Sequence, residues 1–265
     1  SQGYAYSSLV IPKIQQEQKA GIYGYDVIQH SIQSFLTNLK PVGAFAPLAP
    51  VIFRPDVLDD KNWADGFQTG FVDGDKLVYM FGWYSSKWAI NTDLVKEGEI
   101  KSIKDLLDPK WGNGKIGMVD VRSGSTFTIM LAVKQNLGEE TVKKLVVDQA
   151  PLFHRDERII TERLLRGQIA VTNARVHAFI QDFRDQGLGK NVKSIDLPES
   201  RSALTGSGLW LMKNAPHPNA AKLFINWLLT KEGQDAWKPT GIGNSRRVNV
   251  TPFHPESVVE KGGKY

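Results

Sequence analysis

A polar segment at residues 120–133, DVRSGSTFTIMLAV, gathers a cation, hydroxyl groups and a glycine where an apolar helical run begins. The first turn of a helix has free N–H groups, and glycine lets a ligand approach the backbone closely. Because the helix dipole alone contributes only ~0.3–1 kcal/mol, hydrogen bonds would do most of the holding. The segment favours an anion, with Arg122, Ser123, Gly124, Ser125 and Thr126 as candidate contacts. The alternative is that Ser125 is a helix N-cap and Arg122 a surface charge.

A second candidate segment, Thr172–His177 (TNARVH), directly follows a run expected to be a strand. Ligands of α/β proteins bind beyond the carboxyl ends of strands, which makes Asn173 and Arg175 candidate contacts. A guanidinium is permanently cationic and forms forked hydrogen bonds to carboxylate or phosphate. The segment therefore indicates an organic acid or a phosphorylated molecule as ligand. Alternatively, Arg175 faces solvent at the start of a helix.

Aromatic and histidine residues give weaker signals. Trp83 and Tyr84 could form a wall against an apolar or ring-bearing ligand, or could pack in the core. His30 is either a ligand contact or a structural histidine. Residues 154–156 (HRD) together with Arg158 are expected to form a salt-bridge cluster at the surface. Residues 245–247 (SRR) are expected to form a solvated basic turn.

The composition excludes several classes of protein. Of the 265 residues, 41% are hydrophobic and 23% charged, as is typical of a soluble globular protein, and no apolar run is long enough to span a membrane. Without cysteine there are no disulfides, thiolate metal sites or cysteine nucleophiles. The net charge of +5 is scattered along the chain, so we expect no nucleic-acid partner. No catalytic, cofactor or metal motif is present, and we expect a protein that is not an enzyme and needs no cofactor.

The order of elements predicts an α/β fold, because helical and strand patterns alternate. Residues 44–70 hold several prolines and are expected to be irregular, and 76–91 should form two strands or one that crosses between lobes. The remaining expected helices are 9–19, 31–39, 102–107, 127–137, 139–148, 157–165, 177–184 and 218–229, and the remaining strands are 25–28, 115–119, 168–171, 192–197 and 207–212.

Three stretches carry a family resemblance: KSIKDLLDPKWGNGKIGMVD (101–120), LLRGQIAVTN (164–173) and GSGLWLMKNAPHPNAAKLFINWLLTKEGQDAW (206–237). They resemble the extracytoplasmic solute-binding proteins of bacterial ABC importers, in the branch that contains the ferric-ion-binding proteins. The third stretch is the most specific, with its Pro-His-Pro-Asn-Ala-Ala helix start followed by Glu-Gly-Gln. The resemblance runs along nearly the whole chain in the same order.

The resemblance implies the type 2 periplasmic-binding fold, in which two α/β lobes joined by crossing strands enclose a ligand cleft. Lobe one would comprise residues 1–85 and 201–265, and lobe two residues 86–200. Family members begin with a strand, a helix and a second strand before the segment that matches residues 1–21. This amino-terminal portion is expected to be missing here, which would leave lobe one incomplete.

The resemblance also implies the kind of ligand. In the ferric-binding relatives adjacent tyrosines hold Fe(III) where this chain has Ala174 and Arg175, and a carboxylate ligand falls at Ser31. A hard trivalent cation needs anionic oxygen ligands, so iron binding is the alternative and an anionic solute the leading hypothesis. The expected partners are a small anionic ligand and an ABC permease, and the protein is expected to be a monomer. Its expected location is the periplasm, or the outer surface of a Gram-positive cell as a membrane-anchored protein.

Overall fold

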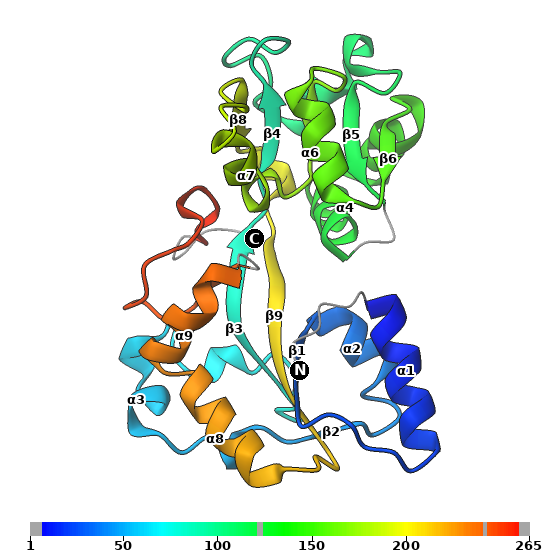
Figure 1. The fold of residues 1–265 in the computed structure, drawn as a ribbon. Coiled ribbons are helices and arrows are strands. Elements are labelled where there is room, and N and C mark those ends of the chain that lie inside the picture. Colours follow the sequence, from blue (N-terminus) through cyan, green and yellow to red (C-terminus); the bar gives the residue numbers. More distant parts are fainter. Residues whose placement is uncertain (1–6, 121–123, 241–242, 260–265) are drawn as a thin grey trace. The chain divides into compact units, whose positions relative to one another are not determined.

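Two β-sheets with helices packed against them make up the computed structural model, which describes residues 7–120, 124–240 and 243–259 (Figure 1). The mixed α/β architecture confirms the predicted fold class. The chain divides into two compact units, unit 1 with residues 1–84 and 205–253 and unit 2 with residues 85–204 and 254–265. Residues from His254 onward are thus grouped with unit 2, whereas the sequence assigned them to lobe one. Within the described ranges, no helix is long and apolar enough to cross a membrane.

The sheet of unit 1 has the strand order β1-β9-β3-β10, and β2 also pairs with β9. The pairs of β9 with β1 and β2, and of β10 with β3, are antiparallel, and the β1–β9 register places Val27 opposite Leu211 and His30 opposite Gly208. The strands are β1 (Val27–His30), β2 (Phe45–Ala46), β3 (Val78–Ser85), β9 (Ala203–Met212) and β10 (Asn244–Ser245). The helices are α1 (Ser7–Lys19), α2 (Ile32–Asn38), α3 (Pro55–Leu58), α8 (Pro218–Leu228) and α9 (Lys231–Trp237).

Side chains of these strands alternate between two apolar clusters, one on each face of the sheet. On one face, Phe81 and Leu209 pack with buried residues of α8 and α9. On the other face, Met80 and Trp210 pack with buried residues of α1 and α2. The sheet is therefore covered by helices on both faces.

Two adjacent arginines near the carboxyl end of the chain are buried in unit 1, so the prediction of a solvated basic turn was wrong. Arg246 is 1% and Arg247 3% exposed. The Nη atoms of Arg246 donate to the carbonyls of Met80 and Ala64 at 3.0 and 2.8 Å, and its guanidinium lies 5.0 Å from the Trp83 ring centroid. Backbone carbonyls and aromatic faces thus replace water around these cations.

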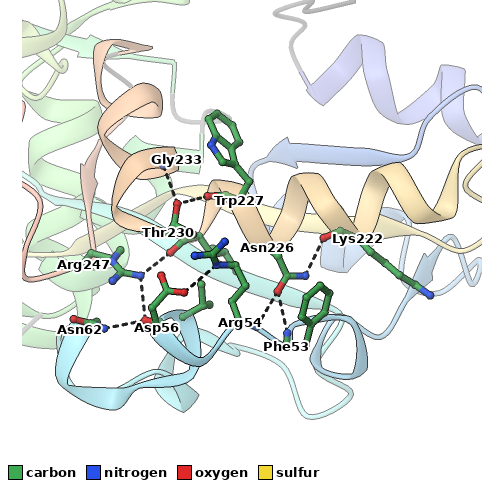
Figure 2. A network of polar contacts seen from close by, with 12 residues as sticks. Phe53, Arg54, Asp56, Asn62, Lys222, Asn226, Trp227, Thr230, Gly233 and Arg247 are labelled. Atoms are coloured by element: carbon green, nitrogen blue, oxygen red, sulfur yellow. Dashed lines mark hydrogen bonds and ion pairs between the residues drawn. The ribbon is translucent and has the colours of Figure 1, made fainter.

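The buried amide of Asn226 joins α8 to the segment that leads into α3 (Figure 2). Its Oδ1 accepts from the main-chain N–H groups of Phe53 and Arg54 at 2.9 and 3.2 Å, and its Nδ2 donates to the carbonyls of Val51 and Lys222 at 2.7 and 2.9 Å. In the same network, Arg247 Nη1 donates to the carbonyl of Leu229 at 2.9 Å. The range 44–70, predicted to be irregular, contains β2, α3 and short 3₁₀ turns. The side chain of Asn226 on α8 fixes its residues 51–54.

The sheet of unit 2 has the order β6-β5-β7-β4-β8, with β5 parallel to β6 and β7, and β4 antiparallel to β7 and β8. Because β5 and β7 are parallel, their carboxyl ends meet at one edge of the sheet. The strands are β4 (Trp88–Asn91), β5 (Ile116–Val119), β6 (Leu152–His154), β7 (Val171–Thr172) and β8 (Val192–Ile195). The helices are α4 (Gly124–Leu137), α5 (Glu139–Lys143), α6 (Glu157–Leu165) and α7 (Ile180–Arg184).

Most predicted elements are confirmed with shifted ends, but several differ. Strands β2 and β10 and helix α3 were not predicted. Strand β6 was not predicted, because three residues are too short for a visible alternation. The predicted helix 139–148 is α5 followed by a π-helical turn, Lys144–Asp148. Residues 102–107 form a 3₁₀ helix, Ile103–Leu107, whose capping box pairs Ser102 with Asp105.

Candidate ligand site

Two of the segments predicted to bind a ligand meet in unit 2, at the ends of β5 and β7. Asn173 Nδ2 donates to Thr126 Oγ1 at 3.1 Å, and Asn173 Oδ1 accepts from the main-chain N–H of Val119 at 3.2 Å. Thr126 is 0% and Asn173 4% exposed. The amide of Asn173 therefore holds the first turn of α4 against the end of β5.

Arg175 forms an ion pair with Glu157, the first residue of α6. Its Nε lies 3.0 and 3.2 Å from the two carboxylate oxygens, and its main-chain N–H donates to Glu157 Oε2 at 3.1 Å. The side chains of Arg175 and Glu157 are 29% and 12% exposed, so this pair is not screened as a surface pair would be. The carboxylate fixes Arg175 at both backbone and side chain and offsets part of its charge.

Further charges near this edge of the unit 2 sheet are paired at the surface. Arg155 lies 3.5 Å from Asp120, and Arg158 lies 2.9 Å from Asp182. The arginine side chains are 79% and 49% exposed. Arg155 and Arg158 thus form surface ion pairs, as predicted, and such pairs contribute little to stability.

The loop after β7 is anchored at every residue from Thr172 to His177. Thr172 Oγ1 accepts from the main-chain N–H of Ala174 at 3.0 Å, and Ala174 and Val176 are buried in the apolar core of unit 2. The ring of His177 packs edge-on against that of His254, with 4.6 Å between centroids and an interplanar angle of 63°. Burial lowers the pKa of His177 to about 3, with smaller contributions from His254 and the Arg175 guanidinium. The loop is thus held in one conformation around Arg175.

The remaining predicted contacts lie in unit 1. His30 Nδ1 accepts from the main-chain N–H of Ser31 at 2.8 Å, and the His30 ring stacks on Phe35 with centroids 4.6 Å apart. Ser31 occupies the N-cap position of α2, and its Oγ lies 3.4 Å from Ser34 Oγ. Both residues therefore have structural roles at the start of α2, whether or not they also contact a ligand.

The two adjacent aromatic residues of β3, Trp83 and Tyr84, differ in burial. Tyr84 is 4% exposed, and Trp83 is partly buried against the cluster that includes α1 and α2. The guanidinium of Arg246 covers the Trp83 ring. These contacts fit the packing role that the sequence left open for both residues.

Two of the predicted contacts, Arg122 and Ser123, lie outside the described residues. Gly124 begins α4, and Ser125 in its first turn is partly buried. Among the residues that the structure describes, no three His, Asp or Glu side chains gather as a metal site.

Sequence reasoning missed Glu157 and His254. Glu157 directly follows the N-cap Asp156, and an acidic residue in the first turn of a helix is common, so the sequence offers no reason to expect a further role for it. His254 is distant in sequence from the loop it packs against. A pairing that depends on tertiary contacts leaves no local signal for either residue.

Comparisons with known proteins agree with this architecture. The family model for bacterial extracellular solute-binding protein matches residues 3–248. A curated relative from Haemophilus influenzae, described as an uncharacterized protein, is 25% identical over 160 residues, which cover 57% of this chain and 45% of the relative. The chain thus spans less than half the length of that relative.

Three solved structures are similar in fold. Iron-bound HitA from Pseudomonas aeruginosa has a TM-score of 0.71 at 18% identity, over 97% of this chain and 80% of its own. The ferric binding protein from Campylobacter jejuni has 0.72 at 17%, over 94% and 78%. AfuA from Actinobacillus pleuropneumoniae, with exogenous fructose-6-phosphate bound, has 0.68 at 22%, over 93% and 77%. At these identities the likeness establishes the fold, and different ligands are named for proteins that share it.

Proposed function

The chain belongs to the family of bacterial extracellular solute-binding proteins, and we propose that it binds a small anionic organic solute, a carboxylate or a phosphorylated or phosphonate compound, for delivery to an ABC permease. Because the matching family is one of extracellular solute-binding proteins, we propose no catalytic step for this chain. We place it in the periplasm, or anchored at the outer surface of a Gram-positive cell.

The observation that carries the proposal is the meeting of the two predicted anion-binding segments in unit 2. The Asn173–Thr126 hydrogen bond joins the start of α4 to the loop that holds Arg175. The N–H groups of a first helical turn and a guanidinium are both complementary to carboxylate or phosphate oxygens. Glu157 offsets part of the positive charge, so the proposed ligand is held by directed hydrogen bonds as much as by net charge.

For the complete site we propose that His30, Ser31, Trp83 and Tyr84, which belong to unit 1, also contact the ligand. A ligand that contacts both lobes favours their closed arrangement, because it gains the second set of contacts only there. A permease can then distinguish loaded from empty protein. Micromolar affinity would require about −8 kcal/mol, which a few charge-assisted hydrogen bonds can supply.

Ferric iron is the second candidate, favoured by the two iron-related structural neighbours named above. We rank it second because the positions expected to carry iron-binding tyrosines hold Ala174, whose methyl is buried, and Arg175, which is paired with Glu157. Neither side chain offers an anionic oxygen to Fe(III).

The proposal is tested by native mass spectrometry of the purified protein, followed by calorimetric titration with fructose 6-phosphate, citrate and inorganic phosphate. We expect Arg175→Ala to weaken binding of the retained solute or best probe about 10- to 100-fold, as the loss of a charge-assisted hydrogen bond predicts. Arg201→Ala is the matched control, because Arg201 is paired with Asp196 at 2.8 Å through its Nε. Equal effects of the two changes would contradict the site. A visible charge-transfer band on adding Fe(III) citrate would favour the iron alternative.

A further inference from the structure

The segment near the carboxyl end of the chain is fixed in unit 1 up to Val250. Arg246 and Arg247 are buried there, and Val250 is 6% exposed. The main-chain N–H of Val248 donates to the Asn62 carbonyl at 3.0 Å, and that of Val250 donates to the Arg247 carbonyl at 3.4 Å. These contacts hold the segment against the body of unit 1.

The same segment is fixed in unit 2 at His254 and Ser257, after exposed residues 251–253. His254 is 5% and Ser257 0% exposed. The Ser257 main-chain N–H donates to the His254 carbonyl at 3.1 Å, and its Oγ lies 3.3 Å from the same oxygen. A short 3₁₀ turn, Pro255–Ser257, thereby presents the His254 ring to unit 2.

The contact of this turn with unit 2 is made on the loop that carries Arg175. The ring of His254 meets that of His177, two residues beyond Arg175, at 4.6 Å between centroids. On the other side of Arg175, Asn173 is held by Thr126 and Val119, and Arg175 itself by Glu157. His254 is therefore the anchor that closes the carboxyl end of the loop.

The chain consequently passes between the units three times. Strand β3 crosses after Tyr84, β9 crosses after Leu204, and the third crossing lies at residues 251–253. Unlike the two strands, the third crossing ends on the loop of the candidate site. A displacement of this segment would therefore act on the loop through contacts that include the pair of His254 and His177 rings.

We infer that His254 is a positioning residue for the Arg175 loop, and that the segment around residues 251–257 connects the conformation of this loop to unit 1. The relevance of the loop to ligand binding rests on the proposed function. The positioning itself does not, because it is a property of the protein without ligand.

Hydrogen exchange of the ligand-free full chain tests the inference, with peptides that cover residues 173–177. We expect His254→Ala to speed exchange in this loop about 2- to 10-fold, since an aromatic pair contact is lost and local opening becomes easier. His254→Phe keeps an aromatic ring at the contact and should restore protection. His217→Ala is the matched control, because His217 is a largely exposed histidine of unit 1 that bonds with Asp26.

A spectroscopic readout separates positioning from a general loss of stability. The ring signals of His177, followed by NMR against pH, should move toward ordinary histidine behaviour in His254→Ala, because the neighbouring ring shields His177 from water. Unchanged exchange of residues 173–177 and unchanged His177 signals in His254→Ala would overturn the inference. So would equal exchange in the Phe and Ala variants.

The outcome is distinguishable from a failure of the proposed function. If the wild-type protein binds none of the anionic probes but His254→Ala still loosens the loop, the proposed function fails and the positioning role stands. If fructose 6-phosphate or citrate binds, His254→Ala should weaken that binding while His254→Phe restores it.

Discussion

Asn173 on the loop after β7 donates a 3.1 Å hydrogen bond to Thr126 in the first turn of α4, and both side chains are buried. Because Asn173 also accepts from Val119, Asn173→Ala leaves a buried N–H without its partner. We expect a loss of about 1–3 kcal/mol in the free energy of unfolding, measured by urea denaturation. A double-mutant cycle with Thr126→Val should show a coupling of about 0.5–1.5 kcal/mol, and strictly additive effects would contradict the pairing.

Asn226 should be the most sensitive polar residue on α8. The change Asn226→Ala removes the hydrogen bonds of this side chain to Phe53, Arg54, Val51 and Lys222 and leaves the N–H groups of Phe53 and Arg54 without their acceptor. We expect destabilisation of about 1–3 kcal/mol, measured by thermal and urea unfolding. Asn219→Ala is the control on the same helix, because Asn219 is exposed. Similar losses in both variants would disprove the assigned role.

Gly70 should tolerate no side chain. A Cβ at this position would lie 2.3 Å from Tyr79 Cε2 and 2.6 Å from Arg246 Nη1, both of which are buried. We therefore expect Gly70→Ala to destabilise the protein by about 1–3 kcal/mol through overpacking. Gly74→Ala is the control, since a Cβ there would meet no atom within 4 Å. Equal midpoints of urea unfolding for the two variants would rule out the proposed clash.

His177 should make the protein sensitive to acid. Burial lowers its pKa to about 3, whereas in the unfolded chain it titrates near the ordinary value of about 6.5. Its neutral form therefore contributes stability above pH ~6.5, and this contribution is lost as the pH falls toward 3. Between these values, unfolding free energy should fall more steeply with acid in the wild type than in His177→Phe, by up to about 1.4 kcal/mol per pH unit. Parallel curves would contradict the lowered pKa of His177.

The fold was largely predictable because its elements carry local signals. Helix α6 was predicted with its observed bounds, since an acidic N-terminus and a following glycine mark both ends. For residues 76–91 the aromatic and β-branched content predicted either two strands or one crossing strand, and the structure has two, β3 and β4. Strand β6 was not predicted, because three residues carry too little sequence pattern and the strand is stabilised by its pairing with β5.

The candidate site was predictable only in part. The segments around Thr126 and Asn173 were identified because polar residues directly follow strands, a local pattern. The burial of Arg246 was not predicted, since its carbonyl partners at Met80 and Ala64 are far away in sequence. Arginine is usually found at the surface of proteins, so the sequence favours an exposed side chain. Only the tertiary structure shows which groups replace water around a buried arginine.

The path of the chain through the two units also determines the order in which they can form during synthesis. Unit 2 is continuous from residue 85 to residue 204 apart from its carboxyl-terminal turn, so nearly all of it leaves the ribosome as one stretch. In unit 1, β9 lies between β1 and β3, and the first 84 residues cannot complete their sheet until β9 has been translated. Residues 1–84 are therefore separated along the chain from β9, which pairs with both β1 and β3, by nearly the whole of unit 2.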